Sequence, residues 1–87
     1  MTDLLNIRND INSRFTVDVF ASNYTGGSDD WYSLPPGEQG SWKRQRTGWE
    51  LVAFRRSGTD GHRAGVYVQI PCVVVFHDFD NIEVKPA

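Results

Sequence analysis

Short stretches in which apolar and polar residues alternate recur along the chain, and they constrain its fold more than any other feature. Within residues 15–22, every second position from Phe15 to Ala21 is apolar and most positions between them are polar. A period of two residues is typical of a β-strand with one buried face. Turn-forming runs such as Pro35-Pro36-Gly37 separate these stretches. The chain is therefore predicted to be all-β.

Strand patterns of this kind occupy residues 15–22, 31–34, 41–46, 49–56, 64–70, 72–77 and 82–85. About seven short strands with such turn spacing predict a small antiparallel β-sandwich. Residues 51–54 are apolar at successive positions, which predicts a central strand for 49–56. Because Trp49 begins that strand, we expect it in the core.

The N-terminal residues leave several structures open. Leu4, Leu5, Ile7 and Ile11 have spacings that suit one face of a short helix, but an edge strand or a loose arm is equally open. We therefore predict an N-terminal arm or short helix over 1–13 and one β-sandwich domain over 14–87. A chain of 87 residues buries a thin core. A homodimer would extend this core and cover edge strands, and we expect one.

Cysteine content and the N-terminal sequence bear on the compartment. Cys72 is the single cysteine, so no disulfide can form within the chain. Residues 1–12 lack an apolar stretch of signal-peptide length, and no apolar run is long enough for a transmembrane helix. These features predict a cytoplasmic protein, with release by a leaderless route left open. Apolar neighbours of Cys72 predict a core thiol with a raised pKa.

Charge gives little support for a nucleic acid partner. The formal net charge is −2, and although residues 42–46 interleave a tryptophan with basic side chains, the acidic balance argues against such binding. Acids predominate in residues 1–38 and bases in residues 43–63. We expect these segments to neutralise each other across a sheet, and a basic patch for an anionic ligand is the alternative.

No recognisable catalytic or metal-binding motif is present. His62 and His77 lie outside known motifs, and a five-residue separation along one strand puts Cys72 and His77 on opposite faces. We therefore predict no enzymatic activity. The oxygen-rich turns at 27–30 and 77–81 could share a calcium ion, but ordinary solvated turns are the favoured interpretation. No cofactor is expected.

Aromatic residues are concentrated between residues 24 and 49, which contain three Trp and two Tyr. Aromatic faces stack on the C–H surfaces of sugars, while polar side chains bind the hydroxyl groups. We predict a lectin with Trp42 or Tyr32 as the stacking platform. Trp42, between Ser41 and Lys43, is expected to be the most exposed tryptophan. The candidate ligand-binding residues are Asp29, Asp30, Trp31, Tyr32, Trp42 and Arg44.

The segments 31–37, 41–44, 48–54, 64–68 and 75–77 together resemble small leaderless β-sandwich proteins of mushroom-forming fungi. That resemblance implies a lectin or a lipid-binding cytolysin acting in defence. The order of segments is also loosely similar to actinoporin-like proteins, although this chain is shorter and shows no long amphipathic N-terminal helix. A membrane-binding alternative would use the same aromatics with Arg55, Arg56 and Arg63. A protein-interaction domain without a small-molecule ligand is the third hypothesis.

Overall fold

The computed structural model describes residues 3–22, 30–44, 47–58 and 62–86, which form eight β-strands and no helix. The strands are β1 (Asp3–Asn9), β2 (Val17–Ala21), β3 (Tyr32–Leu34), β4 (Gln39–Lys43), β5 (Gly48–Arg56), β6 (Arg63–Ile70), β7 (Cys72–Asp78) and β8 (Asn81–Pro86). Each of the seven segments predicted from the alternation overlaps one of the strands β2 to β8.

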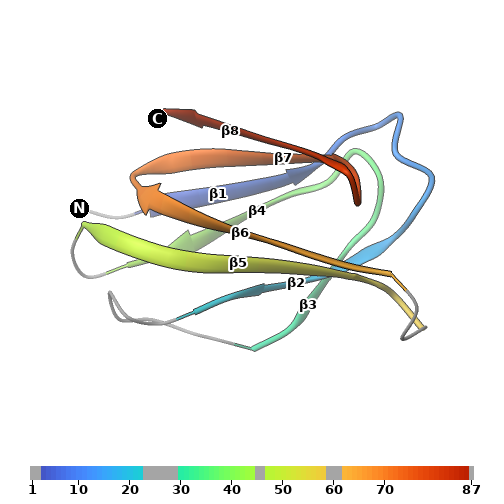
Figure 1. Ribbon diagram of the computed structural model, residues 1–87, viewed down its shortest axis with the longest axis horizontal. Coiled ribbons are helices and arrows are strands. Elements are labelled where there is room, and N and C mark those ends of the chain that lie inside the picture. Colours follow the sequence, from blue (N-terminus) through green and yellow to red (C-terminus); the bar gives the residue numbers. More distant parts are fainter. Residues whose placement is uncertain (1–2, 23–29, 45–46, 59–61, 87) are drawn as a thin grey trace.

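The strands form two four-stranded sheets that pack face to face (Figure 1). Sheet A has the order β4-β1-β7-β8 and sheet B the order β3-β2-β5-β6. All neighbours are antiparallel except β1 and β7, which run parallel. The predicted small β-sandwich is confirmed, with the extra strand supplied by the N-terminal segment. The edge strands β3 and β4 lie on one side of the sandwich, and β6 and β8 lie on the other.

Residues 3–9 form an interior strand, so the prediction of a helix or loose arm is wrong for this segment. β1 pairs with β4 on one side and with β7 on the other. Leu5, Ile7 and Asn9 are fully buried, and Asn6 and Arg8 between them are not. The operative period is thus two, as in a strand. Burial of the Leu5 and Ile7 side chains between the sheets outweighs the helical spacing of the apolar residues at 4, 5, 7 and 11.

The core consists of the inward side chains of both sheets. Phe54 of β5 and Phe76 of β7 meet across the sandwich with ring centroids 5.0 Å apart, and both are buried. The strand 49–56 is interior, as predicted, because β5 has a hydrogen-bonded neighbour on each side. Cys72 is also in the core, and burial raises the pKa of its thiol. Such a thiol is poorly suited to act as a nucleophile.

The turn between β3 and β4 carries the chain from sheet B to sheet A. The amide of Glu38 donates to the carbonyl of Pro35 at 3.0 Å, and Gly37 has φ of 87°. These are the features of a type II turn, in which proline suits the second position and glycine the third. The amide of Gly37 also donates to the carbonyl of Asn9 at 2.7 Å. The turn is thereby attached to the end of β1.

The buried side chain of Asn9 joins the two sheets next to this turn. Its Nδ2 donates to the carbonyl of Leu34 at 2.8 Å and to that of Phe15 at 2.8 Å. The hydroxyl of Ser13 donates to its Oδ1. A buried amide whose donors and acceptor are all used has its desolvation compensated. Asn9 therefore fixes where β3, in sheet B, lies relative to β1 in sheet A.

Candidate functional site

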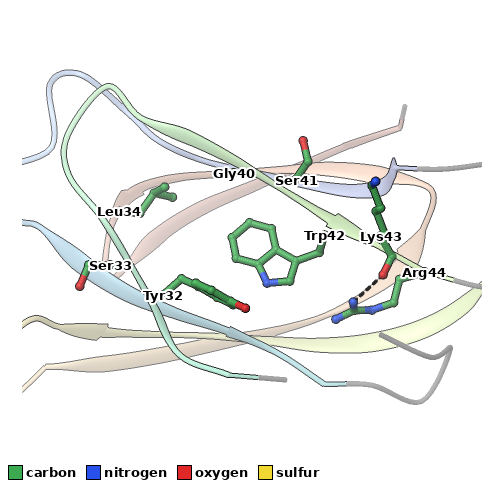
Figure 2. Close-up of a pocket in the computed structure, with 8 residues that line it drawn as sticks. All are labelled: Tyr32, Ser33, Leu34, Gly40, Ser41, Trp42, Lys43 and Arg44. Carbon is green, nitrogen blue, oxygen red and sulfur yellow. Dashed lines mark hydrogen bonds between the residues drawn. The ribbon is translucent and has the colours of Figure 1, made fainter. Parts of the chain in front are cut away.

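A pocket of about 390 Å³ lies between the edge strands β3 and β4. One wall is Tyr32, Ser33 and Leu34, and the other is Gly40, Ser41, Trp42, Lys43 and Arg44 (Figure 2). The two walls belong to different sheets, so the pocket is the open side of the sandwich between them. Its volume falls in the range of about 300–1,000 Å³ that is usual for small-molecule sites.

Trp42 forms the inner part of the pocket. Its side chain is buried, with 6% of the residue exposed, and Figure 2 shows the indole lying between the two strands. Nε1 of the indole has no hydrogen-bond acceptor among the described residues. A buried N–H without an acceptor costs free energy. The prediction that Trp42 is the most exposed tryptophan is wrong, because alternation along β4 turns Gly40 and Trp42 inward and Ser41 and Lys43 outward.

Gly40 makes room for the indole of Trp42. A Cβ at position 40 would lie 2.8 Å from Cζ3 and 2.9 Å from Cη2 of the ring. Both distances are shorter than any normal carbon–carbon contact. The absence of a side chain at Gly40 therefore sets the position of the indole, and with it the shape of the pocket.

Tyr32 contributes the exposed aromatic surface of the pocket. It is 46% exposed, and its ring meets that of Trp42 edge to face, with centroids 5.9 Å apart and an interplanar angle of 77°. Edge-to-face contact is a favoured geometry for aromatic pairs. It holds the Tyr32 ring while leaving part of it open to solvent. Of the two predicted platform residues, Tyr32 is the accessible one.

Arg44 closes one end of the pocket as part of a buried ion pair. Its Nε lies 3.5 Å from Oε2 of Glu50, and both side chains are fully inaccessible. Its Nη2 donates to the carbonyls of Ser22 at 2.9 Å and Ala21 at 3.3 Å, and its Nη1 donates to that of Lys43 at 2.8 Å. The hydroxyl of Ser22 donates to Glu50. The predicted role of Arg44 in polar contact with a ligand is replaced by a structural one.

Trp31 lies outside this pocket, on the outer face of sheet B. Its ring contacts that of Phe20 with centroids 5.5 Å apart, and the guanidinium of Arg55 lies 4.0 Å from its centroid. Arg55 also donates to Asp18 at 3.1 Å. Trp31 is 38% exposed. Asp30 is exposed as well, whereas Asp29 lies outside the described residues. The six predicted site residues are thus not brought together as one group.

Trp49 lies on the same outer face and not in the core, so that prediction is wrong. It is 48% exposed and stacks on Tyr67 of β6 with centroids 5.2 Å apart. Its neighbour Glu50 points inward to Arg44 and directs Trp49 outward. Both aromatics line a second groove of about 660 Å³ at the opposite edge, between β6 and β8.

His77 belongs to a charged cluster on the outer side of sheet A that the sequence did not reveal. Its Nδ1 lies 3.0 Å from Oδ2 of Asp10, and its Nε2 lies 3.0 Å from Oε1 of Glu83. Hydrogen bonds to Glu83 and Asp10 raise the pKa of the imidazole. The same contacts lower the pKa values of both carboxyls. Sequence proximity to Asp78 gave no indication of these partners.

The described residues contain no group of three or more His, Cys, Asp or Glu arranged to hold a metal ion. Of the two turns considered for calcium, 77–81 is described and 27–29 is not. Asp78 accepts the amide of Phe79 at 2.8 Å and lies 4.0 Å from Arg14. These contacts account for Asp78 as a turn residue.

Comparisons with known proteins identify no relative. No protein-family model matches the chain, and neither a curated protein nor a solved structure is measurably similar to it. The described residues also contain no helix long and apolar enough to cross a membrane. The resemblance to fungal β-sandwich proteins stays a prediction, and a function has to be argued from the site.

Proposed function

We propose that this protein binds carbohydrate without catalysing a reaction, and that the pocket between β3 and β4 is its binding site. The observation that carries the proposal is the Tyr32–Trp42 pair. It gives the pocket an aromatic surface that is partly open to solvent and tightly held. Rigid, partly exposed aromatic rings suit the C–H faces of a sugar ring.

The unpartnered indole N–H of Trp42 favours a hydroxylated ligand over a purely aliphatic one. It has no acceptor among the described residues, so an oxygen of a ligand that reaches it in the pocket would complete its hydrogen bonding. A sugar hydroxyl supplies such an oxygen, whereas a hydrocarbon tail does not. Hydrogen bonds made in place of an unsatisfied buried donor are especially favourable.

The rim of the pocket is polar. Ser33, Ser41 and Lys43 are exposed. The serine hydroxyls point away from the indole and donate to Asp18 at 3.0 Å and to Asn6 at 2.6 Å on the outer faces of the two sheets (Figure 2). They are therefore placed for the part of a ligand that extends out of the pocket, and their oxygens can still accept a hydrogen bond there. Lys43 also points outward from β4, so its ammonium can donate only to that outer part of a ligand. An apolar interior with a few polar groups at its edge is typical of sites that orient a small ligand.

A glycan array with fluorescently labelled protein, run with calcium and with chelator, tests the proposal. We expect a defined set of bound glycans, retained under chelator because the pocket supplies aromatic and hydroxyl groups. The best glycan is then titrated calorimetrically against two variants, Tyr32→Ala and Tyr67→Ala. Both tyrosines are exposed, but Tyr67 lies outside this pocket. Binding lost in Tyr32→Ala and kept in Tyr67→Ala supports the site. A blank array, or equal loss in both variants, contradicts it.

A second candidate function is binding to a membrane surface. The outer face of sheet B exposes Trp31, Trp49, Leu51 and Tyr67, and tryptophan and tyrosine are favoured at the headgroup level of bilayers. The arginines proposed for that role are partly engaged already, since Arg55 pairs with Asp18 and Arg56 lies 4.8 Å from the ring centroid of Phe15. Sugar-independent flotation with phosphatidylserine vesicles would favour this function over the first.

A further inference from the structure

Strand β6 presents a long unpaired edge. Among the described residues it pairs with β5 alone, in a register that runs without interruption from Gly48–Ile70 to Arg55–Arg63. Its eight residues make it the longest of the four edge strands. A regular strand of this length offers a continuous template for a further strand.

The direction of the β6 backbone groups follows from one hydrogen bond. The amide of Arg56 donates to the carbonyl of His62 at 3.1 Å, which makes these two residues a hydrogen-bonded antiparallel pair. Such pairs alternate along a ladder, so the even-numbered residues of β6 direct N–H and C=O toward β5. Arg63, Gly65, Tyr67 and Gln69 direct theirs away from the sheet.

The other three edges carry features that discourage pairing. β3 has three residues and runs into Pro35 and Pro36. β4 ends at Lys43 and has an irregular register with β1. β8 ends at Lys85-Pro86 and has an irregular register with β7. Prolines, lysines and irregularities are the usual means by which proteins protect edges. β6 has a single charged residue, Arg63, at its start.

We propose that β6 pairs antiparallel with β6 of a second copy of this chain, about a twofold axis through Val66. Inward and outward side chains match only when residues of equal parity lie opposite each other. This register places Val66 opposite the partner's Val66, and Gly65 opposite the partner's Tyr67. Arg63 falls opposite the partner's Gln69, so like charges are not opposed. Sheet B becomes continuous across the dimer.

Side-chain packing favours this register. Val66 is half-buried and packs against the edge of the core, so a second Val66 would shield it from water. Gly65 leaves its backbone on the outer face uncovered by a side chain of its own, and a Cβ there would lie 3.6 Å from the carbonyl oxygen of Val52 and 3.8 Å from Cδ1 of Leu51. An aromatic ring across from a strand glycine covers its exposed backbone. Tyr67 lies opposite that glycine in each direction. Its ring stacks on Trp49, and 60% of the residue is still exposed for this contact.

Two variants at one position test the interface. Gly65→Ala keeps the outward amide, and its Cβ would meet only ordinary contacts at 3.6 and 3.8 Å. Gly65→Pro removes that amide without removing a bond to β5. By light scattering during gel filtration over a dilution series, we expect wild type and Gly65→Ala to be dimers and Gly65→Pro to be a monomer. A monomeric wild type, or a folded Gly65→Pro that stays dimeric, would overturn the proposal.

Amide hydrogen exchange on the unmodified protein provides a test that does not depend on the folding of Gly65→Pro. We expect the amides of residues 63, 65, 67 and 69 to gain protection as the concentration rises. The amides of 64, 66 and 68, already bonded to β5, provide the internal reference. A dimer in which the odd-numbered amides exchange as fast as in the dilute protein would place the interface elsewhere. Neither test depends on whether the β3–β4 pocket binds sugar.

Discussion

Nε of Arg44 lies 3.5 Å from Oε2 of Glu50 in the interior of the sandwich, where neither side chain is accessible to water. Arg44 follows β4 of sheet A and Glu50 belongs to β5 of sheet B, so the ion pair connects the two sheets. It also directs Trp49 outward, because Glu50 takes the inward position beside it.

Removing one member of this pair is expected to destabilise the protein strongly. Glu50→Ala leaves a buried guanidinium without its counter-charge, which typically costs about 3–5 kcal/mol. The double variant Arg44→Met/Glu50→Leu removes both charges and is expected to recover most of that loss. Urea denaturation followed by tryptophan fluorescence measures both. Lys85→Ala is the control, because an exposed pair such as Lys85–Glu83 contributes less than about 1 kcal/mol. A single variant as stable as wild type would contradict this account.

Gly40→Ala is expected to disturb the pocket through Trp42. The new methyl group would lie 2.8 Å from the indole, so the ring or the strand has to move. Overpacking of this kind costs about 1–3 kcal/mol. Gly65→Ala is the matched control, since its Cβ fits, and it should leave the free energy of unfolding within about 0.5 kcal/mol of wild type. Equal stability of the two variants would show that the indole has room to yield.

Trp42→Phe separates the indole N–H from the bulk of the ring. We expect the protein to stay folded and sugar affinity to fall by about 1 kcal/mol, the usual contribution of one hydrogen bond. Trp42→Ala removes the whole ring and is expected to cost about 3–5 kcal/mol of stability. Calorimetric titration with the best array glycan measures the affinity, and Trp49→Phe is the control outside the pocket. Unchanged affinity of Trp42→Phe would exclude the N–H from sugar binding.

The His77 cluster predicts a stability that depends on pH. Hydrogen bonds to Glu83 and Asp10 raise the pKa of His77, so its contribution is complete below the ordinary histidine pKa of about 6.5 and is lost as pH rises through the raised value. Contacts with His77 lower the pKa values of Asp10 and Glu83. Their contribution is complete above their ordinary values and is lost as pH falls through the lowered ones.

The cluster therefore stabilises most between about pH 4.5 and 6.5. Thermal melts of wild type and His77→Gln across pH 3–9 check this window. We expect the difference in Tm between the two proteins to be largest inside the window and to shrink on both sides. A difference that stays constant with pH would mean that His77 acts through packing alone.

The strands could be predicted from the sequence because alternation and turn residues are local signals. Which tryptophans face the core could not. The polar neighbours of Trp42 on both sides suggest an exposed residue. In a half-buried strand, however, a residue that points inward also has polar neighbours on both sides. The position of Trp49 at the start of a central strand predicts a core residue, but Trp49 is exposed. A shift of one residue exchanges the two faces of a strand. Because Glu50 is buried, the even-numbered residues of β5 point inward and Trp49 points outward.

The candidate site has the same limit. Tyr32 and Trp42 belong to different sheets, and their contact depends on the turn and on Asn9, which hold β3 and β4 at one open side. The spacing of residues along the chain does not show which side chains of two different sheets lie close together. The charged clusters around His77 and Arg44 were missed for the same reason. For the Arg44–Glu50 pair, the one local signal in the sequence was the position of an acidic residue, Glu50, between Trp49 and Leu51.

The position of β1 has a consequence for how the chain reaches its native state. β1 lies next to β7, so residues 5–9 find their parallel partners at residues 72–76. Contacts this distant in sequence raise the contact order and slow folding. Sheet B draws only on residues 17–70 and can assemble first. A nascent chain on the ribosome would thus hold β1 without its β7 neighbour until residues 72–76 had emerged, so stable structure in sheet A follows that in sheet B.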